Sequence, residues 1–299
     1  MTKSGIDFSI LPTAWKDCTG FATQFASQRI EQHVLFPASG FDTKNPTPFI
    51  ASNLLRESLF YEARHYTDRA LYHLALGKWL INHNRPTWAI VSYYYSSFFS
   101  AQAAIRLRGT FFVKLNYDSE TNPPPTHQLD VINLTNNQFQ IRQTSGRGSS
   151  EHKKVWLAFY ELYKSISSRE GWAKYRPITA IEGDENRFTE MHRRHLVNYV
   201  PGYGYHEIGS PKECQALCKR LAADLPDDMM ANLHEDDCQM EVRSLLRLEI
   251  CLKLFEKISN EHGAYEVHHK KISKLRSNYL KLFQCPKCLA DRIESALTQ

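Results

Sequence analysis

The sequence lacks an apolar run of the ~20 residues that a bilayer-spanning helix needs. Residues 1–5 show neither an apolar segment nor a cleavage signature, so we expect no secretory signal. Cysteines are few: there are seven in 299 residues, an odd number, and they are scattered along the chain. This usage argues against a disulfide framework, and we expect a cytoplasmic protein with reduced thiols and no membrane partner.

A large excess of one charge is also missing. The 37 Lys and Arg residues against 32 Asp and Glu give a net charge of +5 and a pI near 8.7. This weakly basic balance permits a nucleic-acid partner without requiring one. Because 42% of the residues are hydrophobic and 12% are aromatic, the chain can bury a sizeable core, in one large domain or two small ones.

The stretch from Trp88 to Gly109 has apolar residues at helical spacing on two faces, which predicts a helix buried nearly all round. Thr87 is placed to cap its start after Pro86, and Gly109 to supply the left-handed residue that ends it. A row of small side chains at intervals of four would let a neighbouring helix come close: Ser92, Ser96 and Ser100.

Further helices are predicted over Asn53–Asn82, His152–Ser167 and Asp184–Tyr199, and the short loop at 82–86 makes the first antiparallel to the central helix. One face of the first helix is polar, and the pattern leaves two interpretations open: a polar site, or a solvated face with ion pairs at i, i+4 spacing. The residues of this face are Glu62, His65, Arg69 and His73.

Residues 110–142 lack the helical spacing of apolar residues seen in the preceding segments. Apolar residues alternate over 111–115, and 131–134 and 138–142 predict two short strands around the turn Asn136-Asn137, so we expect a small β or irregular insertion. The loop at 144–150 contains Gly146-Arg147-Gly148 but lacks the Lys-Ser/Thr ending of a phosphate loop, and it is interpreted as a surface loop.

The last third of the chain is more charged, with helices predicted from Pro211, over Asp236–Glu261 and over Glu266–Phe283. Residues 264–292 carry seven Lys and Arg residues against two acidic ones, which makes this segment a candidate for contact with a nucleic-acid backbone. A solvated helix face is the alternative. The candidate contact residues are Lys270, Lys271 and Lys274.

The helix order resembles that of the HEPN superfamily of helical bundles. The residues behind the likeness are Tyr94, Tyr95, Phe98, Ala101, Ala104 and Gly109, with Arg194, Asn198 and Tyr199 in the last bundle helix. The likeness implies a mainly α protein: an HEPN-like helical bundle at 51–205 with a small β or irregular insertion, after an N-terminal arm at 1–50 and before a basic helical C-terminal extension at 206–299.

Many HEPN members are metal-independent ribonucleases of bacterial toxin and antiviral systems, and two protomers usually pool their motifs in one cleft. The motif is an Arg followed after four to six residues by a His. The resemblance implies that Arg187 holds the scissile phosphate and His192 acts on the 2′-hydroxyl or the leaving oxygen. Arg147 and His152 share this spacing outside the expected helix, and Phe188 stands where nucleases of the family often have a polar residue.

The resemblance adds RNA-contacting residues on the same helix: Arg193, Arg194, Asn198 and Tyr199. Members that lack the nuclease His resemble this helix as well, which leaves a second hypothesis. In it the chain is a non-catalytic subunit of a larger defence complex, paired through its helices over residues 236–283.

The spacing of Cys285-Pro-Lys-Cys288 is that of half a zinc knuckle. Cys214 and Cys218, one helical turn apart, could complete a site, and the other candidates are Cys238, Cys251, His262, His268 and His269. A zinc-stabilised nucleic-acid adaptor is therefore a third hypothesis. The alternative is a reduced cysteine pair at the end of a helix.

Overall fold

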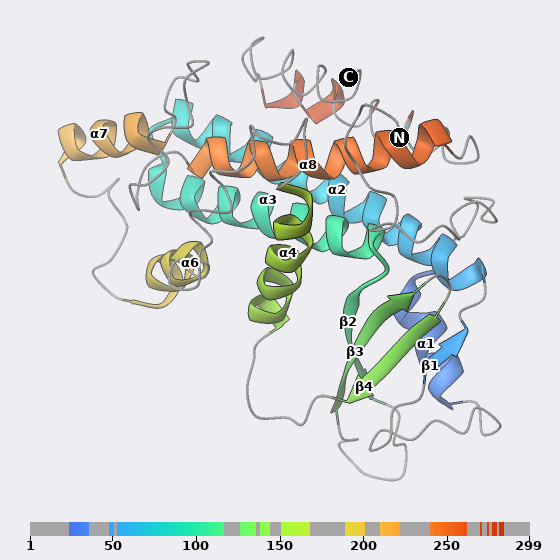
Figure 1. Ribbon diagram of the computed structural model, residues 1–299. Coiled ribbons are helices and arrows are strands. Elements are labelled where there is room, and N and C mark those ends of the chain that lie inside the picture. Colours follow the sequence, from blue (N-terminus) through green and yellow to red (C-terminus); the bar gives the residue numbers. More distant parts are fainter. Residues whose placement is uncertain are drawn as a thin grey trace.

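The computed structural model describes residues 24–35, 48–50, 53–116, 126–135, 138–143, 151–167, 189–200, 210–221 and 240–261, with 270, 274, 277–279 and 281–283. The protein is mainly helical. Its longest described helices are α2 (Asn53–Asn82), α3 (Pro86–Leu107) and α8 (Met240–Glu261), which run alongside one another (Figure 1). No helix in the described ranges combines the length and apolarity that a membrane crossing needs.

Helix α3 is the predicted core helix. All its residues are buried except Trp88, Tyr95 and Phe99. The Oγ of Ser96 donates a hydrogen bond to the carbonyl of Ala70 on α2 at 2.9 Å, so the small side chain does let the two backbones approach. Gly77 allows a second close approach, from the α2 side, since an added Cβ would lie 2.6 Å from Cε1 of Tyr93.

The two ends of α3 differ in how far the sequence predicted them. Gly109 has φ of 91°; its N–H donates to the carbonyl of Arg106, and that of Thr110 donates to Ile105, which confirms the glycine stop. The predicted cap by Thr87 is wrong. The helix begins at Pro86, whose missing N–H needs no partner in the first turn, so Thr87 lies inside the helix and is buried.

Helix α8 is buried on all sides over residues 240–252, including four charged residues. The carboxylate of Glu241 shows how such a charge is held. It pairs with Lys78 at 3.0 Å and accepts a hydrogen bond from Tyr93 Oη at 3.2 Å. Arg247 places its guanidinium over Trp156, with the guanidinium carbon 4.8 Å from the ring centroid.

A small antiparallel sheet lies at one end of α2 and α3 (Figure 1). Its strands are β1 (Pro48–Ile50), β2 (Phe111–Asn116), β3 (Thr126–Thr135) and β4 (Gln138–Gln143), in the order β1-β4-β3-β2. Strand β2 covers the alternating residues 111–115 and β4 the predicted 138–142, whereas β3 begins five residues before the predicted 131–134. The fourth, β1, comes from the segment interpreted as an arm and pairs with β4, with Phe49 opposite Phe139.

The shorter helices pack around this frame. They are α1 (Ala26–Leu35), α4 (Glu151–Ser167), α6 (Thr189–Tyr199) and α7 (Pro211–Leu221). Helices α4, α6 and α7 all contact α3. The predicted start of α6 at residues 184–188, the start of α8 at 236–239 and most of the predicted helix at 266–283 lie outside the described residues.

Candidate functional site

Three helices bring polar side chains together around Tyr94 of α3. The Tyr94 hydroxyl lies 2.6 Å from Nδ1 of His152, which stands in the first turn of α4. The His152 ring stacks on Phe98, with centroids 4.1 Å apart and planes at 11°. Stacking and the hydroxyl together fix the orientation of the imidazole.

Arg194 reaches the same place from α6. Its guanidinium carbon lies 5.3 Å from the ring centroid of Tyr94 and 6.0 Å from that of Tyr95, and Nη1 donates to the Tyr95 hydroxyl at 3.3 Å. Its Nε is buried and has no hydrogen-bond partner within the described part of the chain. We call Tyr94, Tyr95, His152 and Arg194 the tyrosine cluster. It offers a planar cation and a histidine with a fixed ring.

His73 of α2 borders the tyrosine cluster, with its ring 5.5 Å from those of both Tyr95 and Phe99. Burial, and then the positive charge of Arg69, lower the pKa of His73 from 6.5 to about 4. The imidazole is therefore neutral near pH 7. It contributes packing rather than charge to this region.

The residues singled out in the sequence are only partly brought together. His192 is exposed on α6, two residues from Arg194; because a helix turns ~200° over two residues, the two side chains leave opposite faces. Asn198 and Tyr199 are exposed as well. Arg187, Phe188 and the side chain of Arg193 lie outside what the structure describes, so the Arg187–His192 pair stays a prediction.

His152 is the residue of the tyrosine cluster that the sequence did not assign. Its spacing from Arg147 was noticed, but nothing local indicates a partner 58 residues away on α3. The signal that could have found it is its place at the start of a helix with an aromatic stripe. An aromatic stripe of this kind favours packing on the aromatic helix α3, as the contacts of Trp156 with Tyr94 and Phe98 show.

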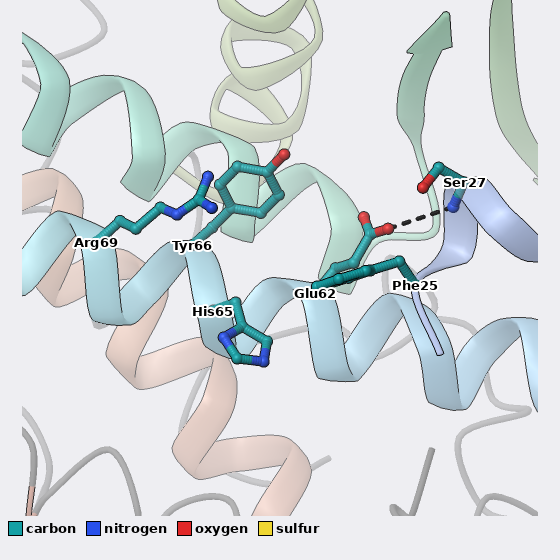
Figure 2. Close-up of a pocket in the computed structure, with 6 residues that line it drawn as sticks. All are labelled: Phe25, Ser27, Glu62, His65, Tyr66 and Arg69. Carbon is teal, nitrogen blue, oxygen red and sulfur yellow. Dashed lines mark hydrogen bonds between the residues drawn. The ribbon is translucent and has the colours of Figure 1, made fainter. Parts of the chain in front are cut away.

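A separate pocket of about 210 Å³ opens between α1 and α2 (Figure 2). It is lined by Phe25, Ser27, Glu62, His65, Tyr66 and Arg69. Three of these belong to the polar face for which the sequence left two interpretations open. The solvated-face interpretation fails for Glu62, which is only 5% exposed, whereas Arg69 is exposed.

The carboxylate of Glu62 is held at the inner side of this pocket. One oxygen accepts a hydrogen bond from Nε of Arg106 at 2.6 Å, and the other accepts one from the backbone N–H of Ser27 at 3.3 Å. Arg106 is itself buried over the Tyr66 ring, 4.2 Å from its centroid, and donates to the side chain of Gln102. The inner end of the pocket is thus the carboxylate of a buried ion pair with Arg106.

The predicted cysteine site is not assembled by the described residues. Cys214 and Cys218 are buried in α7, and the Cys214 thiol donates to the carbonyl of Asn84 at 3.4 Å. Burial raises the pKa of Cys251 to about 12, which disfavours the thiolate that a metal needs. The described part of the chain holds no group of three or more potential metal ligands. Cys285, Cys288, Cys238, His262, His268 and His269 lie outside it, so zinc stays a prediction.

Of the basic residues proposed for nucleic-acid contact in the C-terminal segment, Lys270 and Lys274 are exposed. Lys271 lies outside the described residues. Tyr279 and Phe283 of the same segment pack edge-on against Tyr72, with centroids 5.6 and 5.4 Å away. This segment therefore contacts α2.

Fold and sites together define a mainly helical protein with a polar cluster between helices and a separate pocket. Comparisons with protein-family models, with curated proteins and with solved structures each find no match to the chain. The likeness to HEPN bundles therefore depends on the sequence motifs and the order of the helices.

Proposed function

We propose that the chain is an HEPN-like, metal-independent endoribonuclease of a prokaryotic toxin or antiviral system, with the tyrosine cluster as its reaction centre. The observation that carries the proposal is the convergence of Arg194 and His152 on Tyr94 from two different helices. RNA transesterification needs a cation and an imidazole, and here both are held at the same tyrosine.

Each member of the cluster has a role in this proposal. The guanidinium of Arg194 binds the scissile phosphate, because its planar fork presents paired N–H donors. His152 accepts the proton of the ribose 2′-hydroxyl as its oxygen attacks phosphorus. The bond from phosphorus to the 5′ oxygen breaks, and that oxygen takes a proton from water. The His152 imidazolium then gives its proton to the resulting hydroxide, and the products are a 2′,3′-cyclic phosphate and a 5′-hydroxyl. Tyr94 is a positioning residue that orients the imidazole.

The test is cleavage of a panel of short RNAs by the purified full chain in EDTA. We expect cutting by the wild type and a fall of about 100-fold or more in His152→Ala and in Arg194→Gln, with unchanged circular dichroism and thermal midpoint. Products bearing a 2′,3′-cyclic phosphate, seen by mass spectrometry, are part of the expected result.

His192→Ala is the matched control, because His192 is exposed on the same helix as Arg194. If His192→Ala and Arg187→Ala stop cutting while His152→Ala does not, the reaction centre lies at the sequence motif and not at the tyrosine cluster. RNA that is bound but never cut overturns the enzymatic proposal and favours a binding subunit.

A further inference from the structure

The pocket between α1 and α2 takes no part in the proposed cleavage. Its inner end is the buried Glu62 carboxylate, and its outer end is the exposed guanidinium of Arg69. Figure 2 shows Arg69 beside Tyr66, on the opposite side of the pocket from Phe25 and Glu62, with His65 between them. A ligand here meets a hydrogen-bond acceptor inside and a cation outside.

The sides of the pocket are aromatic. Phe25 packs 5.5 Å from Tyr61 and 5.8 Å from His65, and it keeps 41% of its surface exposed. Tyr66 lines the pocket from α2, and its ring has the guanidinium carbons of Arg106 and Arg69 at 4.2 and 5.6 Å from its centroid. Aromatic rings of this kind bind planar heterocycles by stacking.

The size of the pocket limits what it can enclose. A volume of about 210 Å³ is below the ~300–1,000 Å³ of typical sites for whole small molecules. It holds a purine ring and part of a sugar, and leaves a phosphate outside. The exposed Arg69 stands where such a phosphate would emerge, and Arg binds phosphate through paired N–H donors.

The inner carboxylate selects the base. Within the described residues, Glu62 accepts one hydrogen bond at each oxygen, from Arg106 and from Ser27, which leaves further lone pairs, since a carboxylate has about four acceptor positions. Guanine presents two adjacent N–H donors, on N1 and on the 2-amino group, whereas adenine and uracil each present one donor group on the corresponding edge. We propose that this pocket binds a guanine mononucleotide, with the base stacked against Phe25 and bordered by Tyr66, its N–H edge at Glu62 and its phosphate at Arg69.

The experiment is calorimetric titration of the purified full chain with GMP, IMP, AMP and UMP. GMP binds tightest. IMP, which lacks the 2-amino group, binds about tenfold more weakly, and AMP and UMP bind more weakly still. Phe25→Ala weakens GMP binding about fivefold or more, and Arg69→Gln about tenfold. Both residues are exposed, so these variants are expected to fold.

Arg85→Gln is the control for Arg69→Gln, because Arg85 is an exposed arginine in the turn between α2 and α3. Glu62→Gln, if its thermal midpoint shows that it folds, reduces the preference for GMP over AMP to below twofold. Equal affinities for the four nucleotides, no GMP binding at 1 mM, or wild-type binding by Phe25→Ala and Arg69→Gln overturns the proposal.

The titration contains no cleavage step, so this inference and the proposed ribonuclease activity can fail separately. His152→Ala is expected to bind GMP as the wild type does. If the chain cuts RNA but binds no GMP, only this inference is overturned. If it binds GMP but cuts no RNA, only the proposed activity is overturned.

Discussion

At the scale of single residues, Gly77 shows why a small side chain is needed on α2. The Cβ of an alanine there would lie 2.6 Å from the ring of Tyr93, which is fully buried. We predict that Gly77→Ala lowers the free energy of unfolding by about 1–3 kcal/mol, measured by urea denaturation. The sign of the change in unfolding free energy decides the question, because Gly→Ala inside an unobstructed helix stabilises by about 1 kcal/mol.

Asn82→Ala, at an exposed position near the end of α2, is the control for that measurement. It also places an alanine in α2, by shortening an exposed side chain, and no ring lies in its way. Gly77→Ala that is as stable as the wild type, or more so, would show that the close approach to Tyr93 does not exist in solution.

His73 makes stability depend on pH. Its folded pKa of about 4 lies below the ordinary 6.5, so its contribution is complete above pH 6.5 and is lost as pH falls through 4. Asp68 acts in the opposite sense: burial, opposed by Arg64, raises its pKa from 3.8 to about 6, so its contribution is complete below pH 3.8 and lost as pH rises through 6.

The variant His73→Phe separates these two effects. We predict that, between pH 7 and pH 4, the variant loses about 2 kcal/mol less unfolding free energy than the wild type does, because it has no imidazole to protonate. Asp68→Asn should change in the opposite direction, gaining on the wild type as pH rises. Chemical denaturation at several pH values measures both, and parallel curves for all three proteins would contradict the prediction.

The sequence does not predict polar contacts between residues far apart in the chain, such as those separated by 44 and 58 positions. The spacing of apolar residues predicts that Tyr94 is buried, but not that its hydroxyl meets His152, because that contact depends on how α4 crosses α3. The pairing of Glu62 with Arg106 has the same origin. Local patterns specify which face of a helix is buried, whereas the partner of a buried polar group is set by packing.

At the scale of elements, the bounds of α2 and the glycine stop of α3 were predicted, but the cap at the start of α3 was not. Helix α2 has the predicted bounds Asn53–Asn82, because its apolar stripe runs until the turn before Pro86. The hairpin strands β3 and β4 also lie on either side of Asn136-Asn137, as predicted. The exception at the start of α3 arose because proline at the first position removes the need for the cap that Thr87 was expected to provide.

The serine row of α3 gives an element-scale prediction. Ser96 is fully buried and bonded to Ala70 of α2. We predict that Ser96→Ala lowers the free energy of unfolding by about 1 kcal/mol, since it removes one hydrogen bond. Ser96→Leu should lower it by about 3 kcal/mol or more, because it also forces the helices apart.

Urea denaturation of the two Ser96 variants supplies the comparison. Trp88→Leu is the control on the same helix, because its ring is 52% exposed and does not separate α2 from α3. A leucine at position 96 no more harmful than an alanine would mean that the two helices are not in close contact there.

At the scale of the whole molecule, the basic C-terminal segment carries a prediction about RNA binding. We predict that the triple variant Lys270→Glu, Lys271→Glu, Lys274→Glu weakens binding of a short RNA about tenfold or more and lowers the slope of log affinity against log salt. Fluorescence anisotropy at several salt concentrations measures both. Lys212→Glu, at an exposed position of α7, is the control, and an equal loss in it would show that only the overall charge matters.

The salt bridge at the inner end of the pocket bears on how α2 and α3 are aligned. Apolar surfaces of two helices tolerate a shift of one turn with modest loss, but a shift here would leave the carboxylate of Glu62 and the guanidinium of Arg106 each without its counterion where water is excluded. Only one longitudinal position of the two helices satisfies both charges. The ion pair therefore selects a single alignment of α2 and α3 among several that apolar contacts alone would allow.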